Sequence, residues 1–420
     1  MKVIVLGSGI IGTLTAYFLA KQGCEVEVIE QNSGSARGCS FGNGGQLSYG
    51  HIETWAGTTS LLSLLKASIM PNSYLSVKNF ADKELFNWFC EFYLNSFRMK
   101  AKKNSEHLFH LASHSREMMQ EILNNESGIS FNYKNNGTLH FFRKKSSFKR
   151  AIRHTKFERK IGCESEILSK EETIKREPTL QKLYDDKKLA GSIFYKDDAS
   201  GNSFKFASAL EKICKEKYGV KFTYNTKIKN IFTNHQVITG INTSEGVLEA
   251  DKYVYALGAL GDSLLKGIKV ESKIYPLKGY SISIDVNEPD FKAPNMALTD
   301  IENKVVYSRL GNVFRVAGTV EASGINIFKD SKHVRFLKNN VANTFSDFGD
   351  FSKIYSWYGF RPSRPNAIPL ICKSSKYPNL FLNTGHGSLG WTLSAGSGAI
   401  LADLVLEKEN KKFSFLQNKC

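Results

Sequence analysis

The chain has 420 residues, of which 41% are hydrophobic, so it can bury a substantial core, is long enough for two domains and is not mainly disordered. No window approaches the roughly 20 apolar residues that a membrane-spanning helix needs, which argues against a transmembrane protein. The formal charge of +17 suits a nucleic acid, an anionic membrane surface or acidic substrates, but the excess is Lys-rich and spread along the chain, so charge alone does not indicate a nucleic-acid-binding protein.

Cysteine usage bears on the compartment. The seven cysteines are scattered, their number is odd and none forms a C-x-x-C pair, so we predict neither a disulfide framework nor a zinc site, and no metal. This pattern fits a reducing cytosol. We therefore expect a location on the cytoplasmic side, either in solution or peripheral on the inner membrane.

The first thirty residues predict a strand, a glycine turn, a helix and a second strand. Residues 3–6 form an apolar strand and are followed by a G-x-G-x-x-G motif, consisting of Gly7, Ser8, Gly9, Ile10, Ile11 and Gly12. Gly7 permits a tight turn, Gly9 lets backbone approach a pyrophosphate, and Gly12 lets the helix pack against the strand. The order of these elements indicates a βαβ unit that binds the ADP half of a dinucleotide.

An acidic residue ends the second strand. Glu30 lies eighteen residues after Gly12 and is followed by Gln31. A carboxylate at this place accepts hydrogen bonds from ribose hydroxyls and disfavours a 2′-phosphate, which makes NADP a poor fit. On its own, however, this motif leaves NAD and FAD open.

A glycine-rich stretch begins soon after the βαβ unit and comes too early in the chain to be a linker. Within it, the residues expected to run against a flat ring are Ser40, Asn43, Gly44, Gly45 and Gln46. The glycines allow close approach, and the amide side chains supply hydrogen bonds. The alternative is a flexible surface loop.

The middle of the chain mixes helices and strands. Three-to-four spacing of apolar residues predicts helices between 61 and 125, and a further helix is expected over 204–218. Alternating apolar residues predict strands, which we place at 137–142, 190–195, 221–226, 229–233, 237–242, 247–249, 253–256, 272–286, 305–309 and 313–317. The chain closes with a strand over 380–383 and a helix over 391–407. No repeat or low-complexity linker is present, which favours domains interleaved along the chain.

Two C-terminal segments carry further chemistry. Prolines stiffen the backbone around Arg361, and an arginine held in this way suits bidentate capture of a carboxylate, although a structural salt bridge is the alternative. A glycine loop then joins the last strand to the last helix, and its N–H groups could stabilise a developing negative charge. His386 in that loop is a candidate base, with an ordinary loop histidine as the alternative.

These segments, taken together and in order, resemble the FAD-dependent D-amino-acid oxidase superfamily, and most closely the bacterial D-amino-acid dehydrogenase small-subunit family. The resemblance covers nearly the whole chain. It is carried by residues 40–46, 276–281, 360–362, and 379–387 continuing into 390–392, the last being the most specific. One departure is Gly44, where relatives usually have alanine.

The resemblance implies an α/β fold, α+β overall, in which a Rossmann-like FAD-binding domain is interleaved with a substrate domain of mixed β-sheet and helices. We place the FAD-binding domain at 1–55, 190–270 and 355–420, and the substrate domain at 56–189 and 271–354. The implied reaction is oxidative deamination of D-amino acids to 2-oxo acids and ammonia, with hydride transfer from Cα to flavin N5. The electrons would pass to a quinone or other respiratory acceptor.

The resemblance also implies roles for individual residues. Arg361 would hold the substrate carboxylate, helped by Tyr307, with Tyr280 and Tyr49 as weaker alternatives. Besides the N-terminal motif and the 40–46 loop, the expected FAD contacts are Lys227, Ile228, Ala256, Gly258, Gly387, Ser388, Leu389, Gly390, Trp391 and Thr392.

Other readings remain open from the sequence. They are an amino-acid or amine oxidase that reduces O₂, a flavin-dependent tRNA-modifying enzyme, and a binding protein that only retains the fold. The absence of a basic patch interleaved with aromatic residues counts against the tRNA reading, and we expect no nucleic-acid partner. An apolar stripe over 61–70 predicts either peripheral membrane contact or packing against the helical region. The preferred D-amino acid and the oligomeric state are not predicted.

Overall fold

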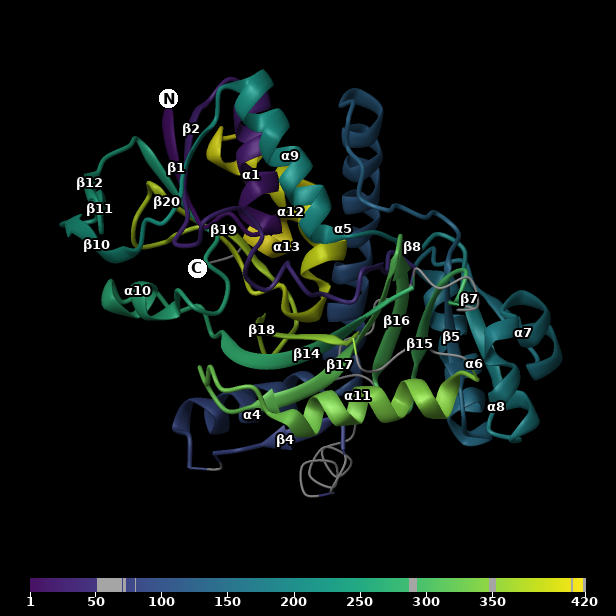
Figure 1. Ribbon diagram of the computed structural model, residues 1–420. Helices are drawn as coiled ribbons and strands as arrows, with labels where there is room; N and C mark the ends of the chain where they lie inside the picture. The colour runs from purple at the N-terminus through teal and green to yellow at the C-terminus, as the bar shows by residue number, and fades with distance from the viewer. Residues whose placement is uncertain are drawn as a thin grey trace.

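The computed structural model describes residues 1–50, 70, 73–79, 81–286, 293–346, 353–408 and 411–417. Its strands form two main sheets in two parts of the molecule, shown above and below in Figure 1. The predicted apolar stripe over 61–70 lies outside the described residues, apart from Met70. No helix in the described part of the chain is long and apolar enough to span a bilayer.

In the described chain the first sheet has six strands. In spatial order they are β19 (Leu370–Lys373), β20 (Leu380–Thr384), β13 (Lys252–Tyr255), β1 (Lys2–Leu6), β2 (Glu25–Ile29) and β9 (Lys221–Thr223). All neighbours pair in parallel except β19 and β20. Parallel strands are buried on both faces, which explains the apolar runs over residues 3–6 in β1 and 380–382 in β20.

Helices cover this sheet. One face carries α1 (Ile10–Lys21), α9 (Ser203–Tyr218) and α12 (Gly390–Val405), as Figure 1 shows. Helix α12 packs closely against α1 at a glycine. A Cβ on Gly398 would lie 3.0 Å from the carbonyl carbon of Leu14 in α1. Close helix contact therefore depends on the missing side chain.

The second sheet has nine strands among the described residues. Its spatial order is β18 (Tyr355–Ser363), β14 (Tyr275–Asp285), β17 (Val313–Ala322), β16 (Val305–Leu310), β15 (Ala297–Asp300), β5 (Thr138–Phe142), β7 (Gly191–Tyr195) and β6 (Glu166–Leu168), with β4 (Leu75–Val77) pairing β17. Helix α11 (Ser331–Thr344) runs along the lower face, where Leu337 and Val341 pack into an apolar core with Ile282 and Phe314.

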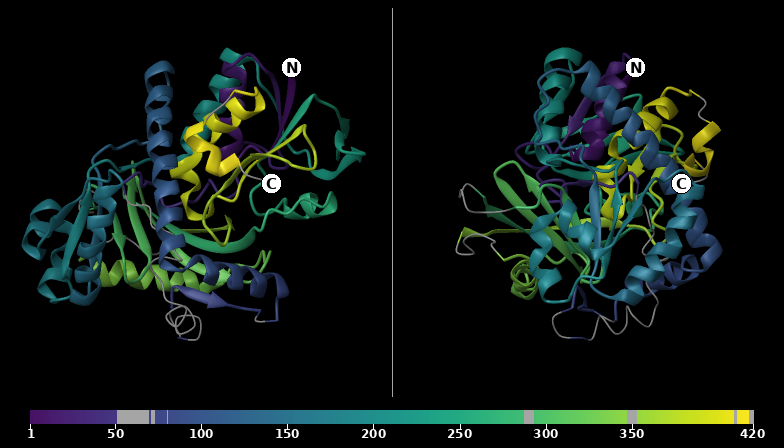
Figure 2. Two further views of the ribbon diagram at one scale, coloured as in Figure 1. Left: turned by 180° about the vertical axis from the view of Figure 1, so that it is seen from behind. Right: turned by 90° about the vertical axis from the view of Figure 1, so that its right-hand side faces the viewer.

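Smaller elements complete the fold. The described helices not yet named are α4 (Lys83–Asn95), α5 (Arg98–Asn125), α6 (Lys145–Lys160), α7 (Lys170–Arg176), α8 (Gln181–Asp185), α10 (Asp262–Gly267) and α13 (Ser414–Gln417). The remaining strands are β3 (Gln46–Leu47), β8 (Ala199–Ser200), β10 (Ile228–Asn234), β11 (Val237–Thr243) and β12 (Gly246–Leu248). Figure 2 shows the long α5 reaching from one part of the molecule into the other.

The α/β fold class is confirmed, as are the helix at 204–218 and most of the predicted strands. The described helices that the apolar spacing did not reveal are α6, α7 and α11 and the short α8, α10 and α13. The expected domain boundaries place β7 and β18 with the FAD-binding segments, whereas both strands pair within the nine-stranded sheet. Cys372 is disulfide-bonded, which its scattered spacing did not predict, because spacing along a chain does not reveal which thiols meet in space.

Candidate active site

A cavity of about 1770 Å³ lies between the two parts of the molecule. Its wall combines segments from both sheets, including the N-terminal glycine motif, the 38–46 loop, strand β18 and the loop before α12. Most predicted site residues line it: Gly7, Gly9, Ile10, Ile11, Glu30, Gln31, Ser40, Asn43, Gly44, Gly45, Gln46, Lys227, Ile228, Ala256, Gly258, Arg361 and the whole run from His386 to Thr392, with the hydroxyl of Tyr280 turned away.

The glycine motif has the backbone that its sequence predicts. Gly7 has a φ of 97°, in the left-handed region, and its N–H donates to the carbonyl of Ile29 at 2.8 Å. A Cβ on Gly12 would lie only 1.9 Å from the Gly7 carbonyl oxygen. Gly12 and the buried Ser8 do not line the cavity, so they shape the turn rather than its surface.

Glu30 reaches the cavity but already has protein partners. Its carboxylate accepts from the backbone and hydroxyl of Ser8 at 2.9 and 3.0 Å, and from the backbone and side chain of Asn32 at 2.9 and 2.7 Å. These four donors match the four lone-pair positions of a carboxylate. A ribose hydroxyl would therefore have to share an oxygen with one of them, most readily with the Asn32 side chain.

The 40–46 loop is tied to the second sheet. Gln46 donates to the carbonyl of Leu298 at 3.0 Å, and the carbonyl of Asn43 accepts from Arg315 at 3.1 Å. A Cβ on Gly44 would lie 2.4 Å from a methyl carbon of Val306. Val306 therefore leaves no room for a side chain at position 44.

The loop before α12 offers unused hydrogen-bonding groups. Helix α12 begins at Gly390 without a side-chain cap, so its first N–H groups and dipole are available at the cavity. Beside it, the Asn383 Oδ1 and Thr384 Oγ1 atoms are buried and have no hydrogen-bond partner among the described residues, and both residues line the cavity. Buried polar atoms are usually paired, so these groups indicate a polar ligand.

Arg361 is one of the cations that line the cavity. It lies on β18, opposite Leu277 of β14, and donates to the carbonyl of Thr319 at 2.9 Å. A Cβ on Gly279 would lie 2.4 Å from the guanidinium carbon, so the guanidinium occupies the space that this glycine leaves. Burial lowers the Arg361 pKa, and no carboxylate pairs with it in the described part of the chain.

Trp357 was not singled out by sequence reasoning. Residues 357, 359 and 361 alternate along β18 and so share one face. The Trp357 ring covers Gly359 and also lies against Gly42, where added Cβ atoms would come within 2.2 and 2.3 Å of ring carbons. This period-two pattern around Arg361 is the signal that could have identified Trp357.

The structure does not bring the three candidate tyrosines together with Arg361. Tyr307 is buried on the other face of its strand, where it stacks on Phe314, and it does not line the cavity. Tyr280 borders the cavity, but its hydroxyl donates to Glu321 at 2.7 Å on the far side of the sheet. Tyr49 is also buried away from the cavity wall. Because successive side chains of a strand point to opposite faces, Val306 and not Tyr307 of β16 faces the cavity.

His386 is buried against α12. Its Nε2 lies 2.9 Å from the hydroxyl of Ser397, and burial lowers its pKa to about 3. The imidazole is therefore neutral at physiological pH and a weak base. These properties fit a positioning role better than proton abstraction.

Comparison with known proteins identifies this constellation. A family model described as FAD dependent oxidoreductase matches residues 2–404. The chain belongs to this family. It is 37% identical to a D-amino acid dehydrogenase of Paramagnetospirillum magneticum over 406 residues, covering 96% of this chain and 95% of the relative. The protein is thus an FAD-dependent oxidoreductase.

Solved structures of flavoenzymes share its fold. A glycine oxidase from Geobacillus kaustophilus superposes with a TM-score of 0.77 at 21% identity, covering 99% of this chain and 97% of that one. An L-α-glycerophosphate oxidase from Mycoplasma pneumoniae, solved with FAD bound, gives 0.70 at 16% identity, covering 100% and 98%. The N-terminal glycine motif and the Asn383 and Thr384 oxygens, which lack partners among the described residues, fit the FAD that the family requires.

Proposed function

We propose that this flavoenzyme oxidises D-amino acids to imino acids, which hydrolyse in water to 2-oxo acids and ammonia. The observation that carries the proposal is the Arg361 guanidinium, which borders the cavity without a carboxylate partner among the described residues. A buried charge is costly unless paired, so an anionic substrate group would complete the site. The kinship with a D-amino acid dehydrogenase supports the substrate class and its stereochemistry.

The protein's main contribution is positioning. The planar fork of Arg361 matches the two oxygens of a carboxylate, and Thr319 and Gly279 fix where that fork lies. Bound FAD supplies the two-electron acceptor. The substrate gives up its Cα hydrogen with the bonding electron pair, its nitrogen lone pair forms the C=N bond, and an amine proton leaves to solvent. A fixed carboxylate orients the Cα–H bond for this step.

The apolar part of the cavity wall supports the reaction. The Trp357 ring and the apolar side chains of Val306 and Ala317 border the cavity beside Arg361 and reduce its water content. An environment of this kind favours the neutral amine, whose lone pair the reaction needs. His386, whose pKa lies near 3, does not act as the base in this proposal.

The expected FAD contacts remain part of the proposal. The N-terminal motif and Glu30 would hold the ADP half, with Lys227 and Ile228 beside the adenine and Ala256 and Gly258 along the same wall. The 40–46 loop and the 387–392 backbone would face the flavin ring. The uncapped start of α12 suits the negative charge that a reduced flavin carries.

We further propose a respiratory acceptor such as a quinone, because the 37% identical relative is a dehydrogenase. Peroxide released in step with substrate turnover would instead establish O₂ as the acceptor. A gel shift with tRNA at low salt tests the nucleic-acid reading, and absence of retention removes it.

Arg361→Ala tests the carboxylate clamp. We expect a yellow, FAD-bound protein whose flavin absorbance near 450 nm is no longer bleached by D-amino acids under anaerobic conditions, because a lost charged clamp costs about 2–5 kcal/mol. Arg361→Lys should restore part of the rate, since it keeps the charge but not the fork.

The matched control is Arg364→Met. Arg364 follows the last residue of β18, three residues after Arg361, but its fork donates to the carbonyls of Ile368 and Ser272 at 2.7 and 3.1 Å. This variant should lose stability and keep bleaching. Loss of FAD from Arg361→Ala, or unchanged bleaching, would contradict the assignment.

A further inference from the structure

Residues 323–330, here called the rim loop, join β17 to α11 and carry apolar side chains into solvent. Ile325, Ile327 and Phe328 are 58%, 67% and 79% exposed, and Tyr355 at the start of β18 is 60% exposed. Ile327, Lys329 and Tyr355 line the mouth of the cavity. The rim loop therefore places an apolar group of side chains at the entrance to the active site.

The backbone of the rim loop is held by side chains of β14 and β18, most of them buried. The Lys278 ammonium donates to the carbonyl of Phe328, and the Tyr358 hydroxyl donates to the carbonyl of Ile327. The N–H of Asp330 donates to the Tyr280 hydroxyl at 3.2 Å, and that of Gly324 donates to a further tyrosine hydroxyl at 3.0 Å. The exposure of the apolar side chains thus follows from a fixed backbone.

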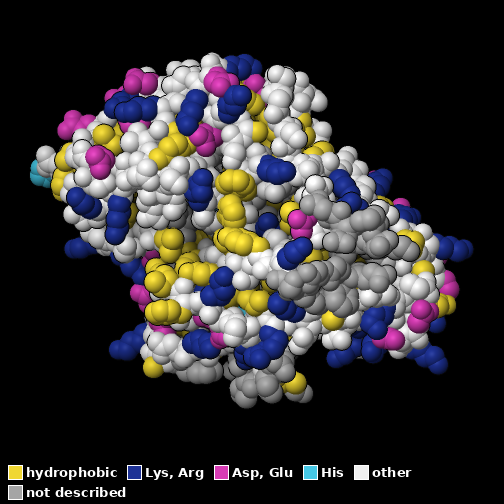
Figure 3. Space-filling view, viewed as in Figure 1, with side chains coloured by type: hydrophobic (Ala, Val, Ile, Leu, Met, Phe, Trp, Pro, Cys, Tyr) yellow, Lys and Arg dark blue, Asp and Glu magenta, His cyan; other side chains and the backbone are white. Residues whose placement is uncertain are grey.

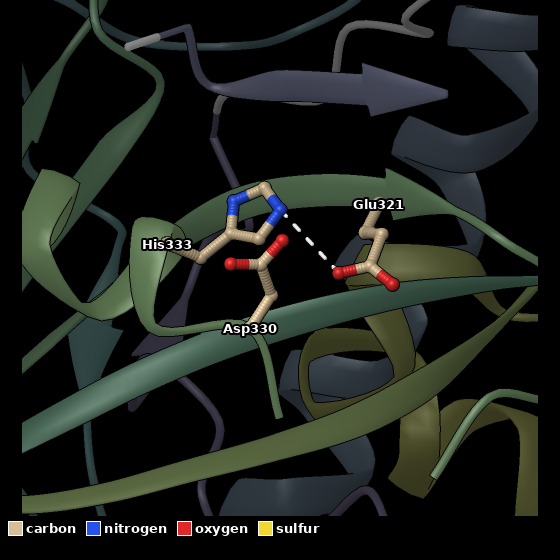
Figure 4. A group of neighbouring side chains, drawn as sticks. All are labelled: Glu321, Asp330 and His333. Carbon is tan, nitrogen blue, oxygen red and sulfur yellow. Dashed lines mark ion pairs between the residues drawn. The ribbon is translucent and has the colours of Figure 1, made fainter. Parts of the chain in front are cut away.

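A polar cluster under the rim loop forms its anchor. Figure 4 shows Glu321, Asp330 and His333 pointing toward one another, with Glu321 and His333 at 3.4 Å. Such a trio could hold a metal ion, but proton donors already occupy it. The hydroxyls of Tyr280 and Ser323 donate to Glu321 at 2.7 Å, and Lys78 pairs with Asp330 at 2.8 Å.

The anchor pairs a carboxylate with a buried ammonium group, and burial lowers the pKa of that ammonium group, Lys278. Burial raises the pKa of Glu321, but hydrogen bonds from His333, Tyr280 and Ser323 outweigh it and bring the value to about 2. Lys278, fully buried 3.6 Å from Glu321, is the matching cation. Burying a charge is costly. Here both charges help to fix the rim loop: Lys278 binds its Phe328 carbonyl, and Glu321 holds the Tyr280 hydroxyl that accepts from Asp330.

Cations outnumber carboxylates in the wall of the cavity whose mouth the rim loop borders. Figure 3 shows apolar side chains gathered at the hollow between the two parts of the molecule, bordered by more Lys and Arg than Asp and Glu side chains. The chain as a whole carries +17, so a second copy would bring the same charge to this face and be repelled. Protruding apolar side chains among cations suit a surface with an apolar interior and anionic groups.

We propose that the rim loop docks the enzyme on an anionic phospholipid bilayer by inserting Ile325, Ile327 and Phe328. The docked enzyme faces its cavity mouth to the membrane, where an apolar electron acceptor dissolves. This inference rests on the proposed function, because it assigns the surface by which the acceptor reaches the cavity.

Co-sedimentation of the holoenzyme with vesicles tests the proposal. Wild type should bind phosphatidylcholine vesicles that contain phosphatidylglycerol and bind weakly without it. Ile325→Ser/Phe328→Ser, which alters two side chains outside the cavity wall, should weaken binding at least about tenfold. The matched control is Met99→Ser on α5, whose side chain is 85% exposed, and its binding should be unchanged.

Activity readouts separate docking from catalysis. The double variant should keep anaerobic bleaching by D-amino acids and turnover with a soluble dye, and lose turnover with a long-chain quinone held in the vesicles. Equal vesicle binding by wild type and the double variant overturns the proposal, as does a wild type that binds no vesicles or self-associates through the rim loop. Failure of wild-type bleaching would instead overturn the proposed function, whatever the vesicle result.

Discussion

Arg361 can lie where it does only because residue 279 has no side chain. In Gly279→Ala the new Cβ would lie 2.4 Å from the guanidinium carbon, and a flexible side chain can move away at little cost to the fold. We expect a stable, FAD-bound enzyme whose Km for the amino acid rises about tenfold or more, as for a displaced charged clamp.

A double-mutant cycle checks this dependence. If Gly279→Ala acts by displacing Arg361, it should add little to the loss already caused by Arg361→Ala. Additive losses of flavin reduction rate would show that Gly279 acts by another route.

His386 gives a prediction at the same scale for the pH dependence of stability. Burial lowers its folded pKa from 6.5 to about 3, so between these values the unfolded chain binds more protons. Its contribution to stability is therefore complete above pH 6.5 and is lost as the pH falls toward 3. The urea midpoint of wild type should drop more steeply over this window than that of His386→Gln. Parallel pH curves would refute a buried neutral imidazole.

The crossing of α1 and α12 links element packing to cofactor binding. A Cβ on Gly398 would press on the backbone of Leu14, which cannot swing away as a side chain can. Gly398→Ala should therefore destabilise the protein by about 1–3 kcal/mol and weaken FAD binding, because α1 starts at the glycine motif. Unfolding midpoints and FAD titration measure both effects. Gly267→Ala on α10, where the Cβ would meet nothing within 4 Å, is the control.

At the scale of the whole molecule, the cavity is closed by segments of both sheets, so a ligand that fills it should hold the two parts together. FAD should raise the unfolding temperature of the apoprotein in a concentration-dependent way, because at a hundredfold excess over Kd it adds about 2.7 kcal/mol to the free energy of unfolding. ADP would contact only the N-terminal motif, Glu30 and the wall at Lys227 and Ile228, so at the same concentration it should stabilise less. Equal effects of FAD and ADP in a thermal scan would argue against a flavin contact with the second sheet.

The dinucleotide-binding motif could be predicted from the sequence because it depends on short-range interactions. The turn at Gly7, the helix contact at Gly12 and the acid at Glu30 are set by residues close together in the chain. The strands and the α9 helix followed from periodicity for the same reason. The family resemblance added Arg361 and the 387–392 loop, and the structure places them on one cavity.

Only the tertiary structure decided which faces these elements present. A one-residue step along β16 exchanges Val306 at the cavity for Tyr307 in the core, and the pairing of distant strands sets that step. Likewise, the sequence does not reveal that Gly279 contacts Arg361 or that Trp357 contacts Gly42. Nor does it reveal that Lys278 binds the rim loop. Those contacts join residues far apart in the chain, so they depend on sheet register and on folded backbone, whereas the glycine motif depends on its neighbours alone.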